Sequence, residues 1–189
     1  MTRLLAILLA AVALAACSGA DIRVAPAGVA APTAPTERVS IRYRSVEVAL
    51  VTMPTYATTE EIVIAAADGT VVPIGALWSD EPARAMTLQL ARELGVVTSR
   101  IVAPEPWPFR DRADARVDVR VEDFHATQRG TFRIAGQYYV APEEAGREVA
   151  RGFAVEAPIV GAPTAASIAS ARTAATGRLV VAIARDSLR

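Results

Sequence analysis

The sequence has very few residues of the kinds that carry most protein chemistry. Among its 189 residues there is one cysteine, Cys17, and one histidine, His125, and there is no lysine or asparagine. A single cysteine excludes a disulfide within the chain and a thiolate cluster for a metal. A histidine-rich zinc site needs a second histidine, and a catalytic triad needs partners at a defined geometry around the one histidine, which the sequence does not indicate. We therefore expect no catalytic residues, no metal and no cofactor.

An excess of charge of one sign is also missing. The chain has 20 basic residues, all of them arginine, and 20 acidic residues. Proteins that bind nucleic acid through electrostatic attraction carry a basic surplus. The sequence also has no glycine-rich phosphate-binding loop, no dinucleotide-binding fingerprint and no Gly-x-Ser-x-Gly nucleophile elbow. The sequence thus predicts no nucleic-acid partner and gives no support to an enzyme.

The apolar run at the start of the chain, residues 4–16, is too short to span a membrane. It has 13 residues, follows Arg3 and ends in Leu14-Ala15-Ala16-Cys17, whereas a spanning helix needs about 20 apolar residues. A basic start, a short apolar run and small residues are typical of a secretory signal. Because the last four residues resemble the bacterial lipobox, we expect 1–16 to be a lipoprotein signal peptide and Cys17 to carry the lipid.

The residue after Cys17 bears on where such a lipoprotein is sorted. It is Ser18 and not the aspartate that commonly retains bacterial lipoproteins in the inner membrane. Two or more acyl chains anchor a protein stably. We therefore expect the protein to be held by outer-membrane lipid through acylated Cys17, at the periplasmic face of the outer membrane.

Alanine and proline dominate the segment that follows. This composition cannot bury enough apolar surface to fold by itself, so residues 17–38 are predicted to be the lipidated cysteine and a flexible tether. At up to ~3.1 Å per residue, such a tether would hold the rest of the chain several nanometres from the membrane. Residues 39–189 are sufficient for a single domain with its own core.

Hydrophobic patterns in this domain predict an α+β fold. One helix is expected from Pro82 to a stop at Gly95, and a second from Pro163-Thr164 onward. A hairpin with a two-residue turn at Asp68-Gly69 is expected, and three alternating segments predict an antiparallel meander. The expected strands are residues 45–53, 61–67, 70–74, 115–124, 131–140 and 147–157. We expect a largely antiparallel mixed sheet with two helices packed on one face.

A loop rich in proline and aromatic residues is the candidate binding segment. Residues 104–111 contain three prolines together with Trp107 and Phe109. The two rings either pack on the core or serve as anchors for a partner protein, since aromatic residues and arginine supply much of the energy at protein interfaces. Only their exposure decides between these options. His125 is expected at the solvated end of a strand.

Several segments in order resemble the PqiC/YmbA type of auxiliary lipoprotein found with MCE-family lipid transporters. The apolar strand and proline-aromatic corner of Val48–Tyr56, the tryptophan and acidic helix start of Trp78–Leu94, and the alternating valines of Ala115–Phe124 are similar to that family's pattern. The final helix, 164–188, and the preceding lipobox complete the likeness. The departures are a longer, proline-rich tether and the absence of the Tyr-Leu pair that often follows the lipobox.

This resemblance implies a non-catalytic ABC-type transport auxiliary subunit. It would sit at the outer membrane and dock an MCE-domain protein, and it could form a homo-oligomer through an edge such as 147–157 or through the Trp107 loop. Three alternatives stay open: a lipid-binding shuttle, an assembly factor of another envelope transport machine, and an envelope hydrolase. A large apolar pocket would favour the shuttle, and convergent carboxylates with displaced pKa values would favour the hydrolase.

Overall fold

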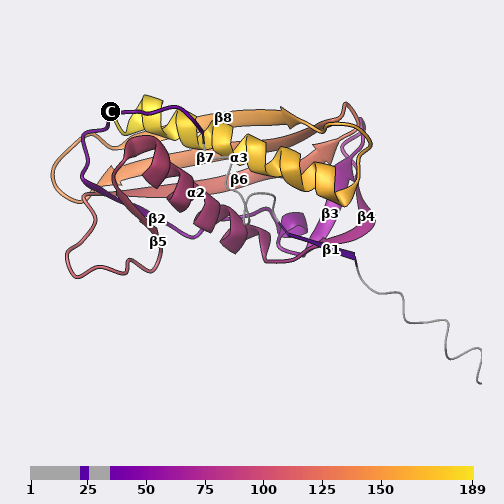
Figure 1. Cartoon of the computed structure of the whole chain (residues 1–189), viewed down its shortest axis with the longest axis horizontal. Coiled ribbons are helices and arrows are strands. Elements are labelled where there is room, and N and C mark those ends of the chain that lie inside the picture. Colours follow the sequence, from indigo (N-terminus) through magenta and orange to yellow (C-terminus); the bar gives the residue numbers. More distant parts are fainter. Residues whose placement is uncertain (1–21, 26–34) are drawn as a thin grey trace, which may run out of the picture.

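The computed structural model describes residues 22–25 and 35–189, which form an α+β domain (Figure 1). The helices are α2 (Pro82–Thr98), α3 (Ala165–Ser187) and the 3-10 helix η2 (Thr55–Ala57). The strands are β1 (Ile22–Val24), β2 (Ser45–Val48), β3 (Glu61–Ala65), β4 (Val71–Trp78), β5 (Ile101–Pro104), β6 (Ala115–Thr127), β7 (Thr131–Pro142) and β8 (Val149–Pro158). The α-helices lie side by side over one face of the sheet. The predicted fold class is confirmed, whereas the signal peptide and Cys17 lie outside the described residues.

Strand β6 is the axis of the sheet. Antiparallel β7 pairs with one edge along almost its whole length, and β8 follows β7, as the predicted meander requires. The other edge is shared, because β2 pairs in parallel with the first residues of β6 and β3 with the last. Beyond β2 lies β5, and beyond β3 lie β4 and then β1. The parallel pairings are short and the long ladders are antiparallel, so the sheet is mixed and largely antiparallel.

This arrangement gives the domain two distinct ends. Strand β6 has 13 residues, which at ~3.3 Å per residue separates its ends by roughly 40 Å. We call one the loop end, made of β2, β5 and residues 105–114. The other is the β1 end, made of β1, β3, β4 and residues 159–164. In Figure 1 they lie on the left and on the right of the molecule.

The apolar segment 45–53 is a shorter strand than predicted. Strand β2 ends at Val48, and the next four backbone amides donate to two kinds of acceptor. Ala49 and Thr52 donate to carbonyls of β6, whereas Leu50 N–H donates to the Glu105 carboxylate (3.1 Å) and Val51 N–H to Thr87 Oγ1 (2.9 Å). The chain bulges here because side chains take over as acceptors, and it meets β6 again at Thr52.

The first helix continues past its predicted stop. Gly95 lies inside α2, which ends at Ser99 with a left-handed φ of 53°. The chain returns beside the helix after Ser99, and a Cβ at Gly95 would lie 3.7 Å from the Arg100 carbonyl oxygen, an ordinary van der Waals distance. That return forms β5 at Ile101–Pro104, a strand that the sequence analysis missed. The second helix begins as predicted, with a capping box between Thr164 and Ser167.

Two local predictions near the β1 end need correction. The hairpin around Asp68-Gly69 exists, but its loop has three residues: Ala66 N–H donates to the Thr70 carbonyl (2.8 Å), and of these loop residues only Gly69 has a positive φ (87°). The tether prediction is wrong for Ile22–Val24, which form β1 in parallel with β4. An apolar strand edge supplied by the folded domain orders these residues, which composition alone does not reveal.

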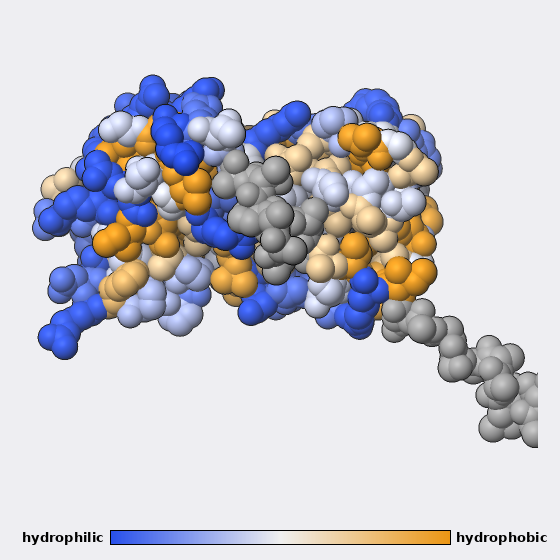
Figure 2. All heavy atoms as spheres, in the orientation of Figure 1, coloured by the Kyte–Doolittle hydropathy of each residue, from blue (hydrophilic) through white to orange (hydrophobic). Residues whose placement is uncertain are grey.

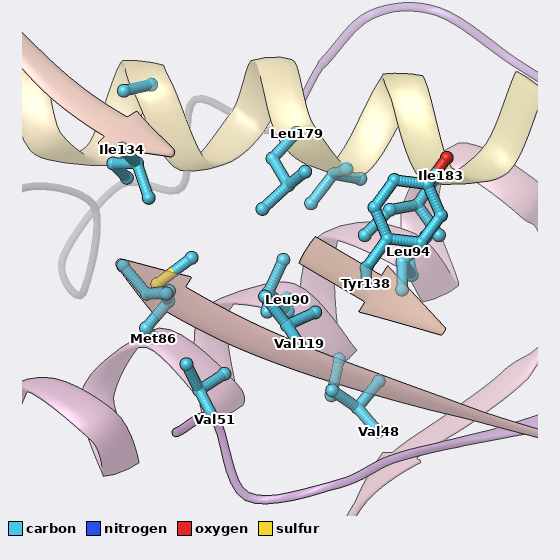
Figure 3. Packing of buried hydrophobic residues seen from close by; sticks show 14 of the residues in the cluster. Val48, Val51, Met86, Leu90, Leu94, Val119, Ile134, Tyr138, Leu179 and Ile183 are labelled. Carbon is cyan, nitrogen blue, oxygen red and sulfur yellow. The ribbon is translucent and has the colours of Figure 1, made fainter. Parts of the chain in front are cut away.

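The core lies between the helices and the covered face of the sheet (Figure 3). From α2, Met86, Leu90 and Leu94 meet β6 and the segment after β2, while Leu179 and Ile183 of α3 cover β7. All of these side chains are buried. No helix in residues 22–25 and 35–189 combines the length and hydropathy needed to cross a membrane.

Candidate partner-binding site

The loop of residues 105–114 projects from the loop end, between β5 and β6 (Figure 1). Its two rings pack on each other, with centroids 5.0 Å apart and planes at 62°. Trp107 is half-buried and its indole N–H donates to the Asp111 carbonyl (2.6 Å), whereas Phe109 is 53% exposed. Neither ring belongs to the hydrophobic core. The exposure of Phe109 therefore fits the interface alternative better than core packing.

Carboxylates at both ends of this loop fasten it to the sheet. Glu105 accepts hydrogen bonds from Leu50 N–H and from the Arg116 guanidinium (3.0 Å), and these bonds lower the pKa of Glu105. Asp114 accepts from Arg44 N–H (2.7 Å), which lowers the pKa of Asp114. Because both carboxylates are held in the ionised form, the loop has fixed ends between which the two rings are presented.

A polar hollow lies beside Trp107. It encloses about 290 Å³ and is lined by residues that include Trp107, Arg112, Arg116 and Glu143. Arg112 forms an ion pair with Glu143, and Arg116 binds Glu47 (2.7 Å) as well as Glu105. Arginines next to exposed aromatic rings are typical of protein interfaces. The hollow and the ring pair together give a surface on which a partner's side chains can be bound.

His125 lies near the end of β6 opposite to the loop of residues 105–114. His125 is half-buried, with Nδ1 3.1 Å from the Ala126 carbonyl oxygen, at a shallow hollow of about 330 Å³ that also holds Arg129 and Arg133. Across residues 22–25 and 35–189, no group of three or more His, Cys, Asp or Glu residues is placed to hold a metal. The solvated strand end predicted for His125 is thus only partly open to solvent.

One pair of charged residues is buried where the two helices meet the sheet. Arg172 of α3 and Glu93 of α2 are 1% and 2% exposed. Burial lowers the pKa of Arg172 to about 10 and raises the pKa of Glu93. Both Nη atoms of Arg172 and Oε2 of Glu93 lack a hydrogen-bond partner among the described residues. The guanidinium carbon lies 6.0 Å from the Trp78 ring and 5.9 Å from the Phe124 ring, so its positive charge faces aromatic π surfaces.

The sequence identified part of this site. It singled out Trp107 and Phe109, and the structure brings the two rings together. It missed Glu105 and Asp114, the carboxylates that fix the loop. Acidic residues on both flanks of a proline-rich loop were the available signal, but their partners, Leu50 and Arg44, are distant in the sequence.

Comparison with known proteins bears on the family and the fold of the chain. The model of the family described as ABC-type transport auxiliary lipoprotein component matches residues 27–184. No curated protein sequence matches the chain. Among solved structures, an uncharacterised protein is similar at 19% identity with a TM-score of 0.67, over 79% of this chain and 95% of its own.

A second similar structure is protein XCC0632 from Xanthomonas campestris, of the family DUF330. It is 17% identical with a TM-score of 0.64, over 88% of this chain and 94% of its own. At these identities the two structures show the shared fold. The resemblance to PqiC/YmbA-type lipoproteins is confirmed, and the chain belongs to the family of ABC-type transport auxiliary lipoprotein components.

Proposed function

We propose that the protein is lipid-anchored through Cys17 at the periplasmic face of the outer membrane and docks the MCE-domain protein of a lipid transporter, without catalysing a reaction. The observation that carries this proposal is the pair Trp107 and Phe109, held on a loop with fixed ends. Family membership makes transport proteins the class of partner to consider.

The positions of the two ends support this orientation. Strand β1 follows Cys17 after only four intervening residues and lies at the β1 end. The ring pair lies at the loop end, roughly 40 Å away along β6. A lipid anchor on Cys17 therefore leaves the loop facing away from the membrane, where a protein that bridges the periplasm would meet it.

A crosslinking pull-down from native envelopes tests the docking. The tagged protein is expected to recover an MCE-domain protein, and a Phe109→Glu variant is expected to lose that recovery, because a charge replaces an exposed anchor ring. Leu88→Glu is the matched control, since Leu88 is an exposed apolar residue on α2 outside the loop. It should recover the partner as well as the wild type does.

The anchor is tested in the same preparation with Cys17→Ala. This variant should lose acylation and leave the membrane fraction, because the only thiol of the chain has been removed. An unchanged membrane location of Cys17→Ala contradicts the anchor. Equal recovery of the MCE-domain protein by Phe109→Glu and by Leu88→Glu contradicts the proposed docking surface.

A lipid shuttle is the second candidate. A hollow of about 480 Å³ lies on α3 and has a mainly apolar lining that includes Pro35, Ala174 and Val181. A site of this size is within the range of small-ligand pockets. Co-purification of phospholipid with the Cys17→Ala protein, without any protein partner, would favour the shuttle over docking.

A further inference from the structure

Strand β1 makes Ile22–Val24 part of the folded domain. Ile22 pairs with Ala76 of β4, and the Ser79 N–H donates to the Val24 carbonyl (3.0 Å). The Arg23 guanidinium forms an ion pair with Glu60, and the Val24 side chain packs against the core. The position of Ile22 is therefore fixed relative to the sheet.

The chain between Cys17 and Ile22 is short. It comprises five residue steps, which span at most ~18 Å when fully extended. On the proposed function, on which this inference rests, the lipid on Cys17 lies in the bilayer. Ile22 and the strand edge beside it then lie within ~18 Å of the membrane surface, in place of the several nanometres that a free tether of residues 17–38 would allow.

The surface at this end is apolar. Ile22 is 66% exposed, Val72 on β4 is 52% exposed and Val160 is 82% exposed. Val72 lies at the end of β6, because Ile64 pairs with both Val72 and Ala126. Figure 2 shows more apolar surface at the end where β3 and β4 lie than at the opposite end, where hydrophilic residues gather.

Val160 belongs to the same end of the domain. The neighbouring Ile159 N–H donates to the Gly130 carbonyl (2.8 Å), which fixes the segment that carries Val160 against the turn between β6 and β7. Two exposed charged residues, Asp68 and Arg129, lie on the turns of this end. Charged residues of both signs at the turn tips favour contact with lipid headgroups over deep insertion into hydrocarbon.

From these observations we infer that the β1 end rests on the lipid surface, with Ile22, Val72 and Val160 in contact with the membrane. The acyl anchor and the apolar end then act together, and they orient the domain with its loop end away from the bilayer. Two contacts joined by a short link reinforce each other, because the link keeps the second contact at a high effective concentration.

Site-specific fluorescence in vesicles tests this contact. The full-length acylated protein is reconstituted in vesicles of phosphatidylethanolamine and phosphatidylglycerol, with or without brominated acyl chains. Since acylation blocks the only native thiol, an added cysteine takes an environment-sensitive dye selectively. Labels at Val72→Cys and Val160→Cys should shift to the blue and be quenched by brominated lipid. Ile101→Cys at the loop end, 55% exposed, is the matched control and should show neither change.

The outcomes separate this inference from the proposed function. If the protein floats with the vesicles and the labels at positions 72 and 160 behave like the label at 101, the membrane contact is wrong while the anchor stands. If the protein does not float, the anchor fails and the inference fails with it. Adding Val72→Glu should reduce the quenching at position 160 without affecting flotation, whereas Ile101→Glu should leave that quenching unchanged.

Discussion

The two ends of β6 expose apolar residues in different settings. At the loop end, Phe109 lies on a loop that is fixed by Glu105 and Asp114. Nearby arginines form ion pairs with carboxylates. At the β1 end, Val72 and Val160 stand on a strand edge and a connecting segment. An aromatic ring among arginines suits a protein partner, whereas dispersed aliphatic residues near the proposed lipid anchor suit a membrane surface. One strand thus separates two surfaces of different chemistry.

The largest expected effect concerns the buried pair beneath the aromatic residues of the β1 end. Arg172→Met removes one of the two cations, Arg92 and Arg172, that stabilise the buried Glu93 carboxylate, and should lower the free energy of unfolding by about 3 kcal/mol. The double variant Arg172→Met/Glu93→Gln removes both charges and should be less destabilised than Arg172→Met, because no buried carboxylate charge is left uncompensated. Chemical denaturation of the two variants and the wild type measures this; equal destabilisation by both variants would show that the charges are not coupled.

The same variant predicts a pH dependence. Burial already raises the pKa of Glu93, and loss of the Arg172 charge should raise it further. Between the ordinary carboxyl pKa and this raised value, the folded state binds more protons than the unfolded state, so stability increases as the pH falls. Thermal unfolding of Arg172→Met at neutral and mildly acidic pH should show this recovery, whereas a melting temperature that only falls with acidification would oppose it.

A second strong loss of stability is expected where β7 packs against the middle of β6, the strand that separates the two ends. A Cβ at Gly136 would lie 2.1 Å from the Arg120 carbonyl oxygen, so Gly136→Ala should force β7 away from β6 and cost about 3 kcal/mol or more. Gly152→Ala in β8 is the control, because its Cβ would meet the nearest atom at 3.9 Å. Similar unfolding curves for the two variants would contradict the proposed close approach.

A smaller effect is expected where β6 bulges near the β1 end. The Phe124 N–H donates to the Tyr56 hydroxyl oxygen (2.8 Å) beside the register shift between Val121 and Asp123. Tyr56→Phe removes this acceptor from a part-buried donor, and should cost about 1 to 2 kcal/mol. Hydrogen exchange should show the loss of protection at the Phe124 amide; unchanged protection would show that the hydroxyl is dispensable.

The smallest expected effect on global stability lies at the loop end. Arg116→Ala breaks ion pairs with Glu47 and Glu105 at a partly exposed site, and should cost less than about 1 kcal/mol. It should nevertheless mobilise residues 105–114, measured as an increase in backbone hydrogen exchange there. Arg120→Ala, which breaks an ion pair within β6, should leave the loop unaffected. Equal exchange in both variants would mean that Arg116 does not fix the loop.

Patterns that depend on neighbours in the sequence predicted their elements well. The alternation in 115–157 gave the meander, and Thr164 gave the start of α3. Elements that depend on distant partners were not predictable. Strand β1 forms because β4 offers an edge, and β5 forms because the chain returns beside β2 after Ser99.

The candidate site was also predictable only in part. Residue types alone indicated Trp107 and Phe109 as candidate anchors for a partner. Their exposure, however, follows from how the loop is fixed. Glu105 and Asp114 look like ordinary loop acids in the sequence. Their function is set by the backbone amides of Leu50 and Arg44, which only the fold brings within hydrogen-bond distance.

Photocrosslinking from both ends in native envelopes tests the central claim most directly. A photoreactive amino acid is placed at Phe109 in one variant and at Val72 in another, both exposed positions. We expect that Phe109 captures an MCE-domain protein and that Val72 captures phospholipid. Capture of the MCE-domain protein from Val72, with none from Phe109, would contradict this claim.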